Sequence, residues 1–485
     1  MESWGSQNFA DCQLGDKRLN QRALEIGKVL VVGFGQALSI IFQEENPLKR
    51  AYEFLANSKA QFNLLTQPHR ETTTQEAQSL PVVLAVGDTT FLDYKNIKAK
   101  REGYGPIGNG GNGLILHTTL AIEPEQGQSL GLLWQKLWHR QPKTKPPANE
   151  TPKQKKARQG VERQVARSKP FELKESYRWV EALKAVDKQF KQVEKHFREV
   201  QKQLEEIDEA VEAIDQKTRI IHIFDREGDI AEVFAQVRQI EHTGVLVRAA
   251  HDRSLDPNNV HLWEHLSTQP IQFYQQVKLA ETAKRKARTA SVAVRFCPVQ
   301  LRVPKRLKNP DPFDVYAVYG VEMDPPEGEE AVAWMLLTTE PVTHEEQAAT
   351  ILRWYTYRWR IEEYHKILKS GCQAESYRLA APSMEALLGF LTVIAAELLR
   401  VTYLHRTQPE APATTVLSSV QLNVLKAKSA KLPKVLTVQW AVDGVARLGG
   451  YLEHRQKTPI GIQVLWRGWL KLASLCEGWL LAGQN

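Results

Sequence analysis

The sequence has few cysteines and no apolar run long enough to cross a bilayer. Its 485 residues include four cysteines, which are scattered at Cys12, Cys297, Cys372 and Cys476. No pair has the spacing of metal ligands or of a redox motif, so we expect neither a zinc finger nor a disulfide scaffold. The apolar stretch LLGFLTVIAAELL is shorter than the roughly 20 residues that span a bilayer, and it predicts a buried helix.

Two further features are missing. The first residues show no basic region followed by an apolar core, the pattern of a secretory signal. The glycine-rich segment 103–113 lacks the Lys-Ser/Thr pair of a phosphate-binding loop, and we interpret it as a flexible turn between strands. We therefore expect a cytoplasmic protein without a membrane partner.

The overall composition is that of a globular protein with a basic excess. Hydrophobic residues make up 42% of the chain and charged residues 25%, and the length suffices for two or three domains. The 64 Lys and Arg residues outnumber the 56 Asp and Glu residues, which gives a net charge of +8. This excess favours a polyanionic partner, with nucleic acid ahead of a membrane surface.

Residues 1 to about 70 show helical periodicity. Leu19, Ala23 and Ile26 recur at helical spacing, and Arg18 and Arg22 belong to a basic side of the same segment. This basic side has two interpretations, a solvated face of a small helical domain or a surface that contacts DNA.

From residue 80 the sequence changes from helical patterns to short apolar strand patterns, and these are followed by a segment rich in charged residues. The apolar run VVLAVG before Asp88 and the segments 113–124 and 130–140 predict strands. Residues 140–169 are rich in Lys and Arg and predict a mobile basic segment, either merely solvated or in contact with a phosphate backbone. A heptad pattern from Leu183 to Ile214 predicts one long helix over about 172–216, packed on this chain's own structure or on another helix.

The second half of the chain begins with strands and ends with helices. Residues from about 240 to 345 are rich in strand patterns, whereas the sequence after about 383 is mainly helical. Near the end, Trp466, Trp469 and Trp479 lie close together, and we expect them to be exposed in a lone subunit. Exposed apolar patches of this kind mark interfaces.

The segment YTYRWRIEEYHKILKSG, residues 355–371, carries the strongest local signal. Steps of three, four and seven residues place Tyr355, Arg358, Glu362 and Lys369 on one side of an uninterrupted helix that ends at Gly371. One interpretation is a solvated face with an ion pair between Arg358 and Glu362. The other is a site that handles phosphate and metal together, since Trp359, Arg360, His365 and Lys366 surround the stripe.

Three carboxylates stand out by their context. Asp88 ends the predicted strand VVLAVG, Asp225 ends the predicted strand RIIHIF, and Glu362 lies on the helix described above. Carboxylates at the ends of adjacent strands and on a helix can converge on two divalent cations, which suits phosphodiester chemistry. Aspartate after a strand is also common in turns, and Asp229 is interpreted as a residue that starts a helix.

Five blocks together resemble the DDE transposases of the bacterial insertion-sequence-four family. The family signature Tyr-x2-Arg-x3-Glu-x6-Lys is matched by Tyr355, Arg358, Glu362 and Lys369 with every spacing intact. The blocks GDTT and DREGDI resemble the two aspartate boxes, and segments near both ends resemble the family's terminal domains. The basic segment and the long heptad helix have no counterpart of similar length in this plan.

The resemblance implies an α/β fold with an RNase H-like catalytic core. It implies an N-terminal helical DNA-binding domain over 1–70, a catalytic domain over 71–382 with a β-strand insertion at about 240–345, and a C-terminal helical dimerisation domain over 383–485. It also implies that Asp88, Asp225 and Glu362 are the catalytic residues. These three would bind two Mg²⁺ ions, with Mn²⁺ as a possible substitute.

The resemblance further assigns residues to the DNA. Arg358, Lys369 and Tyr355 would grip phosphates and the distorted transposon end, with Lys366 as a weaker candidate. Trp334 would stack a flipped base, Trp359 would wedge into the DNA helix, and Arg248 would lie near the same DNA end. Arg18 and Arg22 would contact DNA from the basic N-terminal helix. Trp334 is alternatively a core tryptophan, because its neighbours in sequence are apolar.

The implied activity is cut-and-paste transposition by a homodimer on paired DNA ends. The implied partners are the double-stranded transposon ends and the target DNA, so the protein would associate with the bacterial nucleoid when bound. Two alternatives stay open: a domesticated or inhibitory DNA-binding protein without catalysis, and a stand-alone metal-dependent nuclease.

Overall fold

The computed structural model describes residues 2–97, 102–108, 110–142, 149–205, 217–279, 288–308, 311–429, 431–452 and 460–482. The chain divides into two compact units. Unit 1 comprises Met1–Trp138, Gln189–Arg219 and Tyr357–Asn485, and unit 2 comprises His139–Lys188 and Ile220–Thr356. The division into domains at residues 70 and 382 stays a prediction.

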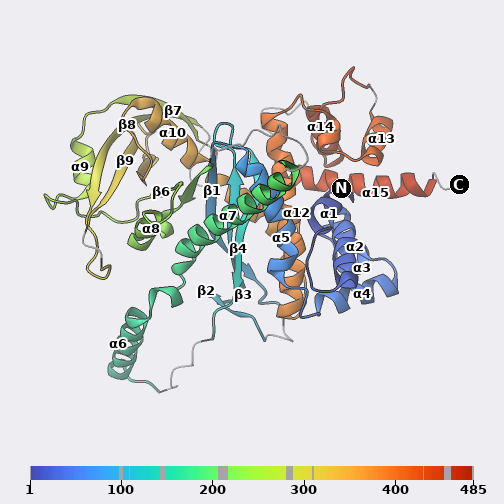
Figure 1. The fold of residues 1–485 in the computed structure, drawn as a ribbon, viewed down its shortest axis with the longest axis horizontal. Coiled ribbons are helices and arrows are strands. Elements are labelled where there is room, and N and C mark those ends of the chain that lie inside the picture. Colours follow the sequence, from blue (N-terminus) through green and yellow to red (C-terminus); the bar gives the residue numbers. More distant parts are fainter. Residues whose placement is uncertain are drawn as a thin grey trace. The chain divides into compact units, whose positions relative to one another are not determined.

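Unit 1 begins with helices, as the periodicity of residues 1 to about 70 predicts (Figure 1). On the second helix Ala23, Ile26 and Leu30 are buried, while the Asp16 side chain accepts a hydrogen bond from the Arg18 N–H at its start. The helices are α1 (Glu2–Phe9), α2 (Lys17–Gly33), α3 (Leu38–Ile41), α4 (Glu45–Leu55) and α5 (Phe62–Gln78).

The strands of unit 1 form an antiparallel arrangement around β3. Strand β1 pairs with one edge of β3, and β2 and β4 pair with the other edge. The strands are β1 (Val82–Asp93), β2 (Gly105–Gly108), β3 (Gly111–Ile122) and β4 (Ser129–Trp138). The prediction of a plain turn over 103–113 is wrong, because Gly105 pairs with Gly113 and the segment forms β2 and the start of β3.

Four further helices of unit 1 follow the signature segment: α12 (Ala381–Thr407), α13 (Ser419–Lys428), α14 (Val438–Leu448) and α15 (Ile462–Ala482), with a 3-10 turn η4 (Ala413–Thr415) between the first two. Helix α12 packs against α5 and β4. By length and composition it alone among the described helices could cross a membrane, but 94% of its apolar window is buried inside the protein. The predicted buried helix is therefore confirmed.

The tryptophans of α15 differ from the expectation. Trp466 and Trp469 are buried, with 9% and 1% exposed, because they pack into unit 1. Only Trp479 is exposed, at 47%, together with Leu480 and Leu481. The expectation of three exposed tryptophans is wrong for the first two, and the exposed apolar surface of this helix is confined to its last turns.

Unit 2 contains a mixed sheet in the order β5-β6-β10-β9-β8-β7. Strands β5 and β6 are parallel, and each of the other neighbouring pairs is antiparallel. The strands are β5 (Arg219–Phe224), β6 (Thr243–Arg248), β7 (Phe273–Leu279), β8 (Arg288–Leu301), β9 (Phe313–Glu322) and β10 (Ala333–Thr338). The prediction of a mixed α/β protein is confirmed, as is the strand-rich character of residues 240–345.

Helices cover the apolar core of this sheet. Trp179, Leu183, Phe224, Phe234 and Leu337 belong to one buried cluster that joins helices and strands of unit 2. The helical elements of this unit are α6 (Pro152–Ser168), η1 (Phe171–Leu173), η2 (Arg226–Gly228), α8 (Ala231–Val237), α9 (Leu262–Thr268) and α10 (Glu345–Thr356), together with the start of α7 (Tyr177–Glu205).

The basic segment and the heptad helix differ in part from their predictions. Residues 152–168 are not an irregular mobile stretch but helix α6, because Thr151 and Gln154 form a capping box at its start. In α7 the seam residues Leu183, Val186, Phe190 and Val193 are buried, so this seam packs within the chain. The later seam positions lie outside the described side chains: Phe197, Val200, Leu204, Ile207, Val211 and Ile214.

Candidate active site

The signature segment 355–371 is not the single α-helix that its sequence predicts. Helix α10 ends at Thr356, α11 spans Trp359–Lys366, and Ile361 donates to the Arg358 carbonyl, three residues back instead of four. Tyr357 explains the break. Its hydroxyl donates to the carbonyl of Glu125 at 2.8 Å, and tertiary contacts of this kind override helix propensity.

The segment ends in a π-helical turn, η3 (Ile367–Gly371). A π-turn contains more residues than an α-turn, so Lys369 does not keep the α-helical spacing from Glu362. The turn stops at Gly371, as predicted. A Cβ atom there would lie 2.9 Å from the ring of Trp466, so the close approach of α15 requires glycine.

The apolar side of the segment is buried as the periodicity predicts. Tyr357, Ile361, Tyr364 and Leu368 are each at most 8% exposed. The Tyr364 hydroxyl accepts a hydrogen bond from Gln135 at 3.1 Å and donates to the Thr392 carbonyl at 3.3 Å. These bonds fix α11 against β4 and α12, and thereby fix the direction of its polar side.

Asp88 lies in the middle of β1, not at the end of a strand as predicted. The strand continues to Asp93, because it pairs with β3 over its whole second half, with Asp88 opposite Thr118. The Asp88 side chain is 21% exposed, and its Oδ1 accepts the N–H of Thr89 at 2.7 Å. The neighbouring Thr89 hydroxyl lies 2.8 Å from the buried ring of His117, a contact that the sequence analysis did not anticipate.

Arg358 joins two of the three candidate carboxylates within unit 1. Its Nη2 lies 2.6 Å from Oε1 of Glu362, and its Nη1 lies 4.0 Å from Oδ2 of Asp88. The Arg358 side chain is only 12% exposed, and its Cζ atom lies 5.0 Å from the ring centroid of Trp359. The ion pair of the solvated-face interpretation is therefore present, but its arginine is largely buried and lies beside a second carboxylate, whereas the Glu362 side chain is 40% exposed.

Lys369 contacts a carboxylate that the sequence analysis missed. Its ammonium lies 3.7 Å from Oε1 of Glu375, and the same oxygen accepts the N–H of Asp93 at 2.8 Å. Glu375 therefore connects the π-turn to the end of β1. It has no motif of its own in the sequence, and only the fold brings it to Lys369.

The residues around the signature differ in their environments. His365 is buried, and its burial, with the charge of Lys369 as a smaller cause, lowers its pKa to about 3. Arg360 donates to the Gly127 carbonyl and the Tyr403 hydroxyl, so it has a structural role. Lys366 is exposed and Trp359 is 56% exposed, so both can reach a ligand.

The donor set of unit 1 fits a hard divalent cation. Asp88 and Glu362 offer carboxylate oxygens, the ligands that Mg²⁺ prefers, and with Arg358 they form a group of net negative charge. Among the described residues, no group of three or more His, Cys, Asp or Glu side chains is close enough together to hold a metal. The third candidate ligand, Asp225, belongs to unit 2.

In unit 2, Asp225 directly follows β5, as predicted. Its side chain accepts the N–H of Glu227 at 2.9 Å and is half-buried. The interpretation of Asp229 as the start of a helix is wrong. Asp229 is 1% exposed and accepts hydrogen bonds from the backbone N–H of Ala250 and from the side chain of Arg253, so it anchors the loop after β6.

Arg248 and Trp334 come from neighbouring strands of unit 2. Arg248 ends β6 and donates to the carbonyl of Ala333, the residue before Trp334 on β10, at 2.9 Å. Trp334 faces Gly320 across the strand pair and is half-buried, so it is not a fully buried core tryptophan. Tyr355, in the last turn of α10 in the same unit, is 7% exposed.

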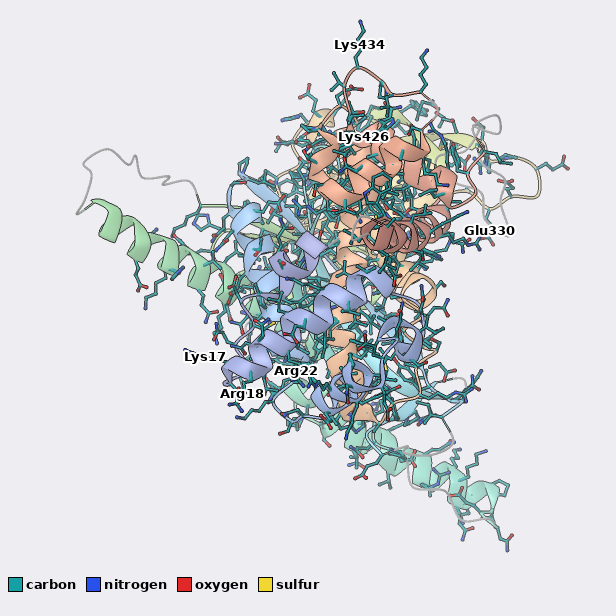
Figure 2. The ribbon with its side chains drawn as sticks, turned by 90° about the vertical axis from the view of Figure 1, so that its right-hand side faces the viewer. Lys17, Arg18, Arg22, Glu330, Lys426 and Lys434 are labelled. Atoms are coloured by element: carbon teal, nitrogen blue, oxygen red, sulfur yellow. The ribbon has the colours of Figure 1, made fainter. Side chains whose placement is uncertain are left out.

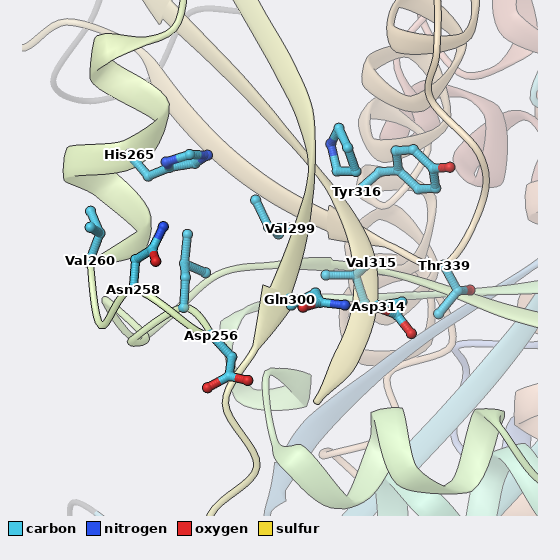
Figure 3. Close-up of a pocket in the computed structure, with 12 residues that line it drawn as sticks. Asp256, Asn258, Val260, His265, Val299, Gln300, Asp314, Val315, Tyr316 and Thr339 are labelled. Atoms are coloured by element: carbon cyan, nitrogen blue, oxygen red, sulfur yellow. Dashed lines mark hydrogen bonds between the residues drawn. The ribbon is translucent and has the colours of Figure 1, made fainter. Parts of the chain in front are cut away.

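A cavity of about 590 Å³ also lies in unit 2, between α9 and the strands β8 and β9 (Figure 3). Its two carboxylates are engaged: Asp314 accepts a hydrogen bond from Gln300, and Asp256 forms an ion pair with Arg302. None of the residues assigned to the active site lines this cavity. The geometry therefore gives no reason to place the chemistry there.

The basic residues predicted on the N-terminal helices gather at the start of α2. Lys17, Arg18 and Arg22 project from its first turns (Figure 2). Lys17 and Arg18 are exposed and Arg22 is half-buried, whereas the opposite side of α2 is buried. This face is available to a polyanion.

The comparison with known protein families bears on this N-terminal part. Residues 1–60 match the family model described as "Transposase DNA-binding". The matched residues contain α1 to α4 and the basic start of α2. The match supports a DNA-binding transposase.

Proposed function

We propose that the chain is a cut-and-paste DNA transposase of the DDE type, with an RNase H-like core and the signature of the insertion-sequence-four family. It binds terminal inverted repeats, excises the element by metal-dependent hydrolysis and transesterification through a hairpin, and joins the 3′ ends to target DNA. The observation that carries the proposal is the group of Asp88, Arg358 and Glu362 in the same unit as the transposase DNA-binding match.

In this proposal the three carboxylates are the metal ligands. Asp88, Asp225 and Glu362 would hold two Mg²⁺ ions. Bound in such a site, two divalent ions activate an attacking oxygen and stabilise a leaving one, which suits every step of DNA cleavage and joining. The half-buried Asp88 and Asp225 are fixed by hydrogen bonds from the backbone N–H groups of Thr89 and Glu227, which keeps their carboxylates in place.

Arg358 and its neighbours act on the phosphates. A guanidinium can donate two parallel hydrogen bonds to a phosphate, and Arg358 already lies beside both carboxylates of unit 1. Lys369 adds a point charge from the π-turn, and the exposed Lys366 is a weaker candidate for the same task. Trp359 is exposed beside Arg358 and supplies an aromatic wedge. Tyr355, in the last turn of α10, takes part in the grip on the phosphates.

The residues of unit 2 act on the DNA end. Trp334 stacks a flipped base, which its half-buried position on β10 permits. Arg248 holds the backbone next to Trp334 and so positions this residue. Arg18 and Arg22 contact DNA from α2. The active form is a homodimer on paired ends in the bacterial cytoplasm.

The test uses a matched pair of adjacent glutamates on α11. Glu362→Gln should abolish Mg²⁺-dependent cleavage of a duplex that carries the element's end but leave binding intact, because the overall charge of the DNA-binding surface barely changes. The control variant Glu363→Gln also removes one negative charge, one residue further along α11. The Glu363 carboxylate accepts a hydrogen bond from Tyr403. This control variant should cleave normally.

Three results would contradict the proposal. Full cleavage by Glu362→Gln removes this residue from the catalytic group. Binding of end DNA without cleavage by the unaltered protein, with Mg²⁺ and paired ends, favours a DNA-binding protein without catalysis. Cleavage of any duplex without regard to its ends favours a stand-alone nuclease.

A further inference from the structure

Helix α6 forms in a place where no burial explains it. None of its residues is buried, and Figure 1 shows it apart from the strands of its own unit. Its start is fixed by the Thr151–Gln154 capping box and by Pro152, and Arg167 lies in its last turn. The sequence therefore specifies a helix here, although it has no protein surface to cover among the described residues.

The cations of α6 are not spread evenly around it. Lys153, Lys156, Arg163 and Arg167 follow one another in steps of three, seven and four residues. At about 100° per residue they fall within roughly 80° of the helix circumference, and at about 1.5 Å per residue they extend over about 21 Å. We call these four residues the α6 stripe.

The α6 stripe has no counter-charge of its own. None of its four side chains forms an ion pair with a carboxylate of the described residues. The acidic residues nearby are used elsewhere: Glu150 and Glu162 both pair with Arg158, which lies on another side of the helix. The chain has thus neutralised one side of α6 and left the other strongly positive.

A glycine interrupts the stripe at its centre. Gly160 occupies the position between Lys156 and Arg163 at the same helical spacing, and a Cβ atom there would have nothing within 4 Å. Glycine inside a helix costs about 1 kcal/mol relative to alanine, and no packing within the chain requires it. Glycine does allow a partner to approach the helix backbone closely.

We propose that the α6 stripe binds the phosphate backbone of duplex DNA without reading its sequence. This inference rests on the proposed function and names a second DNA contact for it, outside the active site and the matched N-terminal residues. A duplex presents one negative charge per about 1.7 Å of its axis, so several phosphates face a cationic row of this length. The helix carries only Ala157, Ala166, Val161 and Val165 as apolar residues, whereas helices that lie on membranes bury large side chains such as Trp, Phe and Leu.

The test compares two double variants of equal charge in the full-length protein. Lys156→Gln with Arg163→Gln neutralises the centre of the α6 stripe, and Lys155→Gln with Arg158→Gln removes two charges from the rest of the same helix. Glutamine is a good helix former, so α6 persists in both. The probe is a short duplex without element ends, and its dissociation constant is measured over a series of salt concentrations.

The stripe variant should bind this duplex more weakly, and the slope of log affinity against log salt should be lower by about 1.8, at about 0.9 per lost phosphate contact. The control should keep the slope of the unaltered protein. Equal slopes in all three proteins, or equal losses in both variants, would overturn the inference. Cleavage of end DNA by the unaltered protein is measured in parallel. If the stripe variant keeps the normal slope while the unaltered protein cleaves, only the role of α6 is refuted. If the stripe variant shows the reduced slope while the unaltered protein does not cleave, only the enzymatic proposal is refuted.

Discussion

Nη2 of Arg358 lies 2.6 Å from Oε1 of Glu362, one helical turn further along α11. A phosphate that binds the guanidinium must compete with Glu362, and a metal ion that binds the carboxylate must compete with Arg358. In the proposed enzyme, a phosphate would take the place of the carboxylate beside Arg358, and Glu362 would then be free to hold the metal ion. We therefore expect this ion pair to couple the binding of metal to the binding of DNA.

Loss of the Arg358 guanidinium should strengthen metal binding while it impairs the chemistry on DNA. In Arg358→Gln the carboxylates of Asp88 and Glu362 lose a cation at about 4 Å or less, an interaction of about 1 kcal/mol or more. The affinity for Mg²⁺, measured by calorimetry without DNA, should rise about fivefold. Hairpin formation should fall more than the first nick, because the phosphate grip is lost.

The control for this prediction is Lys366→Gln. It removes one positive charge from an exposed position on the same helix and should leave the affinity for Mg²⁺ nearly unchanged. An unchanged metal affinity in Arg358→Gln, or an equal rise in both variants, would show that the ion pair does not compete with the metal.

Trp334→Ala should slow hairpin formation without a large loss of stability. Stacking of a base on an aromatic side chain contributes about 1–3 kcal/mol, and Trp334 is only half-buried on β10, where it is paired with Gly320. The rate of nicking is measured on an intact end, the rate of hairpin formation on a pre-nicked end, and thermal unfolding is followed in the same samples. A fall of many degrees in melting temperature with unchanged hairpin rates would instead support the core-tryptophan interpretation.

The elements that periodicity controls were predictable, and those that depend on long-range contacts were not. The buried seam at the start of α7 and the buried α12 follow from patterns of apolar residues, which act locally. The break at Tyr357 follows from its bond to Glu125, more than 200 residues away in sequence. The ion pair between Lys369 and Glu375 likewise depends on a π-turn that no spacing rule indicates.

Acid should destabilise the protein through its buried histidines, and His222 offers a direct test. Burial lowers the pKa of His222 to about 3 from an ordinary value of 6.5, so the unfolded chain binds a proton more readily than the folded one. The stability that this histidine contributes is present above about pH 6.5 and is lost as the pH falls toward 3. At about pH 5 the loss is about 2 kcal/mol.

The measurement compares urea unfolding at about pH 7 and about pH 5. His222→Phe should lose less stability on acidification than the unaltered protein, while His69 and His365, whose pKa values are also lowered to about 3, still contribute. His196→Phe, at an exposed position on α7, is the control and should not change the pH dependence. Equal acid sensitivity in all three proteins would contradict the burial of a neutral His222.

In the proposed homodimer, we expect the last turns of α15 to provide the surface that pairs two subunits. Trp479, Leu480 and Leu481 are 47%, 48% and 61% exposed, and Figure 1 shows this end of α15 extending beyond the other helices of unit 1. Deleting all residues after about 440 would also remove the buried Trp466 and Trp469, so a truncated protein would lose its fold along with its dimerisation. The sharper variant replaces Trp479, Leu480 and Leu481 by serine and leaves the buried part of the helix intact.

This triple-serine variant should bind one element end but fail to assemble two ends and fail to cleave. Light scattering with and without end DNA gives the size of the complex, and a gel assay gives cleavage.

A mixing test then pairs a subunit carrying Glu362→Gln with one defective in end binding through Arg18 and Arg22. Cleavage confined to the end held by the Glu362→Gln subunit supports catalysis across the dimer, since that subunit cannot cut its own end. Cleavage by the triple-serine monomer would show instead that each subunit completes its active site alone.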